Sequence, residues 1–250
     1  MPLRRFFVPR SRIHDREASL PPDQAHHLTH VLRIGAGDQV EIFDGVGGVY
    51  LGTVEVDGKE VRATGLTPVQ AAASPADRRI VLAAALIKSE KLEWVIQKAT
   101  ELGMDEFVPL ETSRSNIKIA DDRRVSRLTR WRTIAAEAAK QSRRDSVPTI
   151  HEISTFAGFV SGDPFPGFAR YLCYEQSTAA WNQDFLGTGA AILCIGPEGG
   201  WDPAEVGMAV GAGFRDFSLG CRTLRSETAA LAALTLFKLR LSPSGVRTNT

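Results

Sequence analysis

The stretch Ala191-Ile192-Leu193-Cys194-Ile195-Gly196-Pro197-Glu198-Gly199-Gly200 decides how this sequence is interpreted. Five apolar residues of strand type run directly into a loop with three glycines. A second loop, 219–228, follows another strand pattern about twenty residues later. Ligands of open α/β sheets bind at the carboxyl ends of the strands, and glycines leave backbone groups uncovered for a flat ligand. We therefore expect these two loops, on neighbouring strands, to form the active site.

The sequence around these loops alternates between strand and helix patterns. The pattern predicts strands at 80–87, 107–110, 149–153, 170–174 and 214–219, and helices at 89–102, 122–142 and 228–241. Such alternation is typical of a parallel sheet covered by helices on both faces. After the first loop, Asp202, Pro203 and Glu205 predict an N-cap, a first helical residue and a reciprocal capping residue. The helix 228–241 is apolar nearly all round, so either the core or a partner subunit must cover it.

The N-terminal part, up to about residue 65, predicts a small β-rich unit with one helix. Strand patterns occupy 4–8, 39–43, 49–56 and 60–66, and Asp57-Gly58 predicts a tight hairpin. Asp23 is expected to cap a helix with one apolar face, formed by Ala25, Leu28, Val31 and Leu32.

The segment 67–75 is rich in small residues and bounded by prolines, as linkers often are. We therefore expect two domains, 1–72 and 76–250. The predicted fold class is α/β, with a C-terminal parallel-sheet domain and a small N-terminal β-rich domain.

Composition excludes several classes of protein. The chain has a net charge of +1, with 24% charged and 43% hydrophobic residues, which is ordinary for a globular protein. It has no uncharged apolar run of about 18 residues and no N-terminal apolar core long enough for a secretory signal, so we expect a cytoplasmic protein.

The three cysteines form no Cys-x-x-Cys pair, and buried, reduced thiols are expected at Cys173 and Cys194. His26 and His30 lack the glutamate of the His-Glu-x-x-His zinc motif, so no metal is expected.

The positive charge is concentrated in two segments. Residues 1–16 hold five arginines against one aspartate, and residues 112–144 hold ten basic side chains against three acidic ones. Such asymmetry indicates a surface that binds a polyanion, although an arginine-rich helix face exposed to water would look the same.

The two loops differ from the usual nucleotide-binding motifs. Gly-Pro-Glu-Gly-Gly fits neither the P-loop nor Gly-x-Gly-x-x-Gly, which argues against ATP and NAD. Together, 195–200 and 219–229 resemble the two signatures of the RsmE family, the 16S ribosomal RNA uracil-N3 methyltransferases of the SPOUT class. The resemblance extends to Lys91–Gly103, to 131–141 with Val147-Pro148, and to 31–33 with 43–45. Ser226 is a mild departure, since threonine is common there, and it keeps the hydroxyl.

The resemblance implies an N-terminal PUA-like RNA-binding domain, a C-terminal SPOUT domain with a deep trefoil knot, a homodimer, and S-adenosylmethionine as the methyl donor. It implies methylation of N3 of a specific uridine in the 16S ribosomal RNA of the small ribosomal subunit. The residues expected to bind the donor are Leu172, Tyr174, Ile195, Gly196, Pro197, Glu198, Gly199, Gly200, Leu219, Gly220, Leu224, Arg225, Ser226 and Thr228. The residues expected to contact RNA are Arg4, Arg5, Arg10, Arg33, Arg114, Lys118, Arg123 and Arg124.

Three side chains are candidates for the chemistry of uracil N3. N3 keeps its proton at neutral pH, so a catalyst must stabilise the uracil anion, and Arg225 is the first choice for this task. Glu198 or Glu227 would be the general base, with helix capping or pairing to an arginine as the alternative role for each.

Two other functions fit the same sequence. The first is a non-catalytic RNA-binding factor of ribosome assembly that keeps the fold for docking. The second is a SPOUT enzyme with another target, such as a ribose 2′-hydroxyl.

Overall fold

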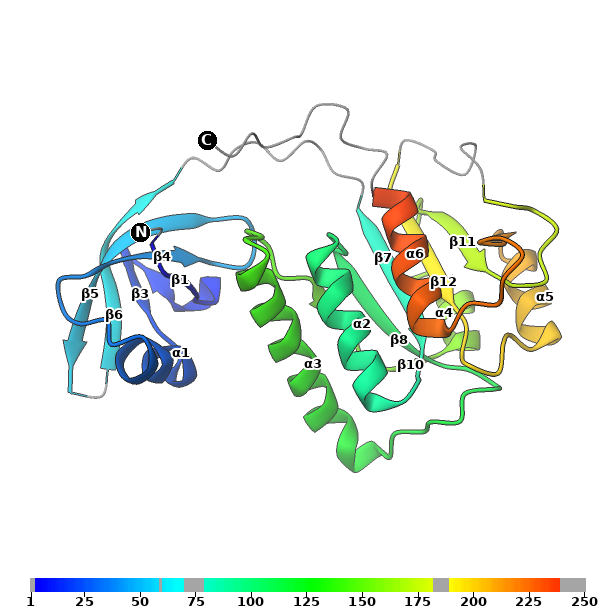
Figure 1. Ribbon diagram of the computed structural model, residues 1–250, viewed down its shortest axis with the longest axis horizontal. Helices are drawn as coiled ribbons and strands as arrows, with labels where there is room; N and C mark the ends of the chain where they lie inside the picture. Colours follow the sequence, from blue (N-terminus) through cyan, green and yellow to red (C-terminus); the bar gives the residue numbers. More distant parts are fainter. Residues whose placement is uncertain (1–2, 59, 70–78, 182–188, 239–250) are drawn as a thin grey trace. The chain divides into compact units, whose positions relative to one another are not determined.

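The computed structural model describes residues 3–58, 60–69, 79–181 and 189–238 (Figure 1). The chain divides into two compact units. One unit comprises 1–74 together with 136–147, and the other comprises 75–135 together with 148–250. Most of the linker expected at 67–75 lies outside the described residues.

The first unit is built on one mixed sheet. Its strand order is β1 (Arg5–Phe7), β4 (Gln39–Phe43), β5 (Val49–Asp57), β6 (Glu60–Pro68), β3 (Glu17–Ser19) and β2 (Ile13–His14). Among the strand pairs that the structure describes in this sheet, only β1–β4 is parallel. Inward-facing residues such as Phe6, Val40, Ile42 and Val54 are fully buried and form the core with Leu28. The prediction of a β-rich N-terminal unit is confirmed.

The hairpin prediction is also confirmed, because Asp57 pairs with Glu60 and Gly58 takes the positive φ of +59° that such a turn requires. The prediction for Asp23 is wrong. Helix α1 (Pro22–His26) begins two residues earlier than a cap at Asp23 would place it; its N-cap is Pro21, which provides no side-chain cap. A proline at the first helical position is already set to a helical φ, so the helix needs no help from Asp23 to start there.

The apolar face expected beyond this helix is only partly formed. After the 3₁₀ turn η1 (Arg10–Arg12) and α1, the chain enters a π-helical stretch, η2 (His27–Val31). The wider π turn rotates the following side chains away from helical spacing. Leu28 is therefore fully buried, whereas Val31 is 59% exposed.

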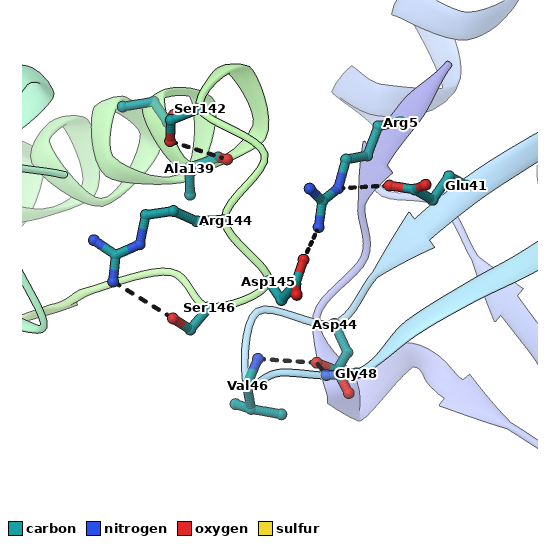
Figure 2. A network of polar contacts seen from close by, with 11 residues as sticks. Arg5, Glu41, Asp44, Val46, Gly48, Ala139, Ser142, Arg144, Asp145 and Ser146 are labelled. Atoms are coloured by element: carbon teal, nitrogen blue, oxygen red, sulfur yellow. Dashed lines mark hydrogen bonds and ion pairs between the residues drawn. The ribbon is translucent and has the colours of Figure 1, made fainter. Parts of the chain in front are cut away.

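The segment 136–147 joins the first unit through a network of polar contacts around Arg5, which Figure 2 shows. Arg5 Nε lies 3.0 Å from Glu41, and its Nη2 donates to Asp145 at 2.6 Å. The guanidinium also lies 4.4 Å from the centre of the Phe43 ring. Only 9% of the Arg5 side chain is exposed. Arg5 thus holds a segment distant in sequence against β1 and β4.

The second unit contains a fully parallel sheet, as predicted. Its order is β10 (Ser154–Thr155), β8 (Glu106–Glu111), β7 (Ile80–Ala85), β12 (Ala191–Ile195), β11 (Ala169–Cys173) and β13 (Arg215–Phe217), and β9 (Thr149–Ile150) also pairs with β8. Its helices are α2 (Ser89–Glu101), the first part of α3 (Asp121–Gln141), α4 (Phe156–Gly162), α5 (Pro203–Gly211) and α6 (Ser226–Lys238). Residues 239–241 of the expected last helix lie outside the described part.

Helices cover both faces of this sheet because successive side chains of a strand point to opposite sides. Val81, Ala83 and Cys194 belong to a cluster with Phe156 and Ala209 of α4 and α5. On the other face, Tyr171 and Phe217 contact Phe237 of α6, which packs beside α2 (Figure 1). The α/β prediction is confirmed.

The network around Arg5 makes a testable difference to stability. We expect Arg5→Met to lower the free energy of unfolding by about 2 kcal/mol, because Glu41 and Asp145 lose a nearly buried cation. The control is Arg62→Met, which removes an exposed pair with Glu60 that water screens, so its effect should be clearly smaller. Urea unfolding of both variants measures the difference. Equal effects would contradict a structural role for Arg5.

Candidate active site

A cavity of about 520 Å³ opens at the carboxyl ends of β11, β12 and β13. Its walls are the loop 196–201 after β12, the segment 218–226 after β13, the residues 173–175 at the end of β11, and Lys91 and Ala229. The expectation that the two loops follow neighbouring strands is wrong, because β11 lies between β12 and β13. The chain leaves β11, adds β12 on one side, and returns to add β13 on the other. The cavity therefore lies where the strand order reverses, which is where open α/β sheets bind ligands.

The first loop is held tightly to the end of β11. The indole Nε1 of Trp201 donates to the carbonyl oxygen of Cys173 at 2.9 Å. Gly196 faces this ring so closely that an added Cβ would lie 2.9 Å from Nε1. Gly200 adopts a φ of +72°. Both glycines are therefore required by local geometry.

The predicted capping box sets where this loop ends. The Asp202 side chain accepts from the N–H of Ala204 at 2.9 Å, and Glu205 accepts from the N–H of Asp202 at 3.2 Å. Glu205 is buried and also accepts from the N–H of Ser113 at 2.8 Å. The loop is thus fixed at the start of α5 and braced by the segment after β8.

One hydrogen bond joins the two loops. Ser226, the first residue of α6, is buried and its hydroxyl donates to the carbonyl oxygen of Gly196 at 2.6 Å. In the second loop, Gly220 takes a φ of +117°, and its N–H donates to Ser218 Oγ at 3.2 Å. An added Cβ at Gly220 would meet no atom within 4 Å. The positive φ, rather than crowding, explains this glycine.

Lys91 is a member of the site that the sequence analysis did not single out. It lies in the first turn of α2 and its ammonium forms ion pairs with Glu198 and, at 3.3 Å, with Glu227. Glu227 is 13% exposed in its side chain, and no donor among the described residues pairs with its Oε2. A cation in the first turn of a helix opposes the helix dipole. This unfavourable position is the feature of the sequence from which a functional role of Lys91 could have been inferred.

These ion pairs set the protonation states at the cavity. The hydrogen bond from Lys91 holds the pKa of Glu198 below its ordinary value, and the positive charges of Lys88 and Arg225 act in the same direction. The same hydrogen bond raises the pKa of Lys91. At neutral pH Glu198 is thus a carboxylate and Lys91 an ammonium.

Burial keeps two cysteines near the ends of β11 and β12 protonated. Burial raises the pKa of Cys173 to about 12 and also raises the pKa of Cys194, so both remain thiols. All three cysteines are free: Cys194 is buried, as expected, whereas Cys173 is only partly buried and Cys221 is exposed.

Most residues expected at the donor site line this one cavity. They are Tyr174, Ile195, Gly196, Pro197, Glu198, Gly199, Gly200, Leu219, Gly220, Leu224, Arg225 and Ser226. Three expected site residues lie off its wall. Leu172 is fully buried in the core, Thr228 is exposed on α6, and Glu227 pairs with Lys91 without lining the cavity itself.

The residues expected to contact RNA are of two kinds. Four of the eight have acidic partners: Arg5 as described, Arg10 with Asp44, Arg114 with Asp202, and Arg124 with Glu111 and Asp121. The other four, which are all exposed, are Arg4, Arg33, Lys118 and Arg123.

No group of three or more possible metal ligands occurs among the described residues. His26 and His30 stack on each other with ring centres 4.5 Å apart. None of the described helices is both long and apolar enough to cross a membrane.

Comparison with known proteins identifies the family. Residues 74–238 match the model of the RNA methyltransferase domain, and residues 20–64 match that of the RNA methyltransferase PUA domain. The chain is 32% identical to ribosomal RNA small subunit methyltransferase E of Synechocystis, over 92% of this chain and 75% of the relative. It is 30% identical to the Bacillus subtilis protein of the same name, over 93% and 94%.

Solved structures agree with this result. A methyltransferase from Legionella pneumophila with bound SAM superposes with a TM-score of 0.84 at 29% identity, covering 95% of this chain and 97% of that one. Ribosomal RNA small subunit methyltransferase E of Neisseria gonorrhoeae, bound to S-adenosyl methionine, gives 0.83 at 28% identity, with 94% and 96% covered. Because both the family models and relatives of at least 30% identity match most of the chain, this protein belongs to the RNA methyltransferase family of the RsmE type.

Proposed function

We propose that this protein transfers a methyl group from S-adenosylmethionine to N3 of a specific uridine in the 16S ribosomal RNA of the small ribosomal subunit. One observation carries the proposal: two glycine loops and the end of β11 enclose a single cavity that Arg225 also lines. The names of the relatives and the donor bound to two similar structures support it.

The residues at the cavity fit the proposed donor. Its volume of about 520 Å³ lies within the range of small-molecule sites. Backbone groups of Gly196, Gly199, Gly200, Leu219 and Gly220 would hold the adenosine and methionine portions. Tyr174 would flank the donor from the end of β11. When bound, S-adenosylmethionine supplies a methyl group on a positively charged sulfur.

The protein's own task is to make uracil N3 a nucleophile. The N3 proton must leave, and the negative charge then spreads over the two carbonyl oxygens of the base. A fixed cation near these oxygens lowers the energy of that anion most effectively, and Arg225, one of two exposed arginines at the cavity wall, is proposed for this role.

We assign proton removal to Glu198, which lines the cavity, and not to Glu227, which pairs with Lys91 and is not part of the cavity lining. Lys91 keeps the pKa of Glu198 low, so Glu198 alone is a weak base. Most of the acceleration would therefore come from positioning and from stabilising the uracil anion.

We further propose that the first unit is a PUA-like RNA-binding domain and the second a knotted SPOUT domain, with the boundary between residues 72 and 76. The division of the chain after Ser74 supports this boundary.

A homodimer is proposed because Leu231 and Leu236 of α6 stay partly exposed beside its buried face. A protein that modifies ribosomal RNA is expected in the cytoplasm.

The reaction is tested by incubating unmodified small-subunit RNA with the protein and the donor, followed by mass spectrometry of the nucleosides. We expect 3-methyluridine. A methylated ribose would instead identify a 2′-hydroxyl enzyme. If calorimetry detects no binding of the donor, a non-catalytic assembly factor is the better description.

Arg225→Ala should lower kcat by about 100-fold and change the Kd of the donor by less than about threefold, because the charge acts on the uracil anion. The matched control is Arg222→Ala, which removes another arginine from the same cavity wall and should leave kcat largely unchanged. Single-turnover kinetics and calorimetry measure the two quantities. Similar losses in kcat and in donor affinity would make Arg225 a residue that binds the donor.

Lys91→Met should raise the pKa of Glu198 toward its ordinary value, because the variant lacks the hydrogen bond and the charge that stabilise the carboxylate. Glu198 would also lose its fixed position, so we expect kcat to fall about tenfold. Titration of the Glu198 carboxyl by NMR measures the pKa, and Lys91→Arg should restore part of both effects. An unchanged pKa would show that Lys91 does not control Glu198.

A further inference from the structure

A second, smaller cavity of about 160 Å³ lies in the second unit, between the start of α2 and the start of α3. It shares no lining residue with the candidate active site. Its floor is apolar, formed by Ile87, Leu92, Ile117 and Ile119, and its polar groups come from Ser89, Lys118, Arg123, Arg127 and Trp131. A partly apolar floor excludes water and so strengthens the effect of charges at the rim.

The charges around this cavity are positive. Within the described part of the chain, no carboxylate lines it, and neither Lys118 nor Arg123 has an ion-pair partner. Arg127 donates to Ser89 Oγ at 2.5 Å and lies 3.9 Å from Glu93.

The acidic side chains nearby are mostly committed elsewhere. Glu93 lies closer to Arg130, at 3.0 Å, and Asp121 lies 2.9 Å from Arg124. Glu90, in the first turn of α2, and Asp122, in the first turn of α3, are the opposing charges that remain. The balance around the cavity therefore favours an anion.

A buried donor provides the second, independent observation. Trp131 is 1% exposed and forms part of the wall, and no acceptor among the described residues pairs with its Nε1. An indole N–H can only donate, and buried donors in native proteins nearly always have an acceptor. An acceptor from a ligand would satisfy it.

The backbone adds a further positive contribution. Helix α2 begins at Ser89 without a side-chain cap from Lys88, so the positive end of its dipole is not neutralised by a capping oxygen. Phosphate groups bind well at such helix ends. Every polar side chain at the wall can donate a hydrogen bond, whereas a phosphate diester offers only acceptors.

We propose that this cavity binds a backbone phosphate of the RNA substrate. The inference rests on the proposed function, since it assigns a second contact point for the same RNA. Phosphate contacts set the register of the RNA and carry no sequence information, so this contact would orient the strand while the active site selects the uridine.

The first test measures RNA affinity at several salt concentrations for the wild type, Lys118→Ala and Arg123→Ala, by fluorescence anisotropy with an unmodified small-subunit RNA fragment. Each variant should bind RNA more weakly and reduce the slope of log K against log[salt] by about one. The control, Lys98→Ala, removes a lysine of α2 that is paired with Glu101 and should behave as the wild type. Affinity for S-adenosylmethionine should be the same in all four proteins.

The second test follows the Trp131 indole N–H signal by NMR in the wild-type protein, identified by its loss in Trp131→Phe. RNA and inorganic phosphate should both shift it, while the signal of Trp94, which is 45% exposed on α2, should not move with phosphate. A shift with phosphate alone, together with unchanged RNA binding in the variants, would overturn the RNA assignment in favour of a free anion. If neither probe shifts it, the proposal is wrong. Loss of methylation in the wild type would instead refute the proposed function.

Discussion

The site depends on the position of β11 between β12 and β13. Because the chain adds strands first on one side of β11 and then on the other, two loops distant in sequence meet above its end. Two hydrogen bonds hold this arrangement: Ser226 to the carbonyl of Gly196, and Trp201 to the carbonyl of Cys173. Both donors are side chains and both acceptors are backbone groups, so the loops are fixed while other backbone groups remain for a ligand.

Electrostatics complete the site from a third direction. Lys91 belongs to α2, which is far in sequence from both loops, yet it neutralises Glu198 and contacts Glu227. Without this ammonium, two carboxylates would repel each other at the base of α6 and at the mouth of the cavity. One lysine thereby stabilises the fold locally and sets the charge of Glu198, which lines the cavity. The ion pair between Lys91 and Glu198 therefore contributes both to the stability of the fold and to the proposed chemistry.

The sequence was sufficient for much of the fold because its local signals agree with one another. The strand 191–195 was predicted with the bounds that the structure shows, and the capping box at Asp202 and Glu205 has the expected hydrogen bonds. The prediction that Asp23 caps the first helix was wrong because Pro22, whose φ is already helical, starts α1 before Asp23. A second error arose where the helical period changed, as at Val31 after the π turn.

Periodicity, glycine positions and capping residues thus determined the type of each element and drew attention to the two loops, since these signals act within a few residues. They contained no information on which strand lies between which others. The strand order, the burial of Leu172, the pairing of Arg5 with Asp145 and the role of Lys91 were decided only by the tertiary structure. The reason is physical: an ion pair or a buried contact joins residues that may be a hundred positions apart, and only packing of the whole unit brings them within a few ångströms.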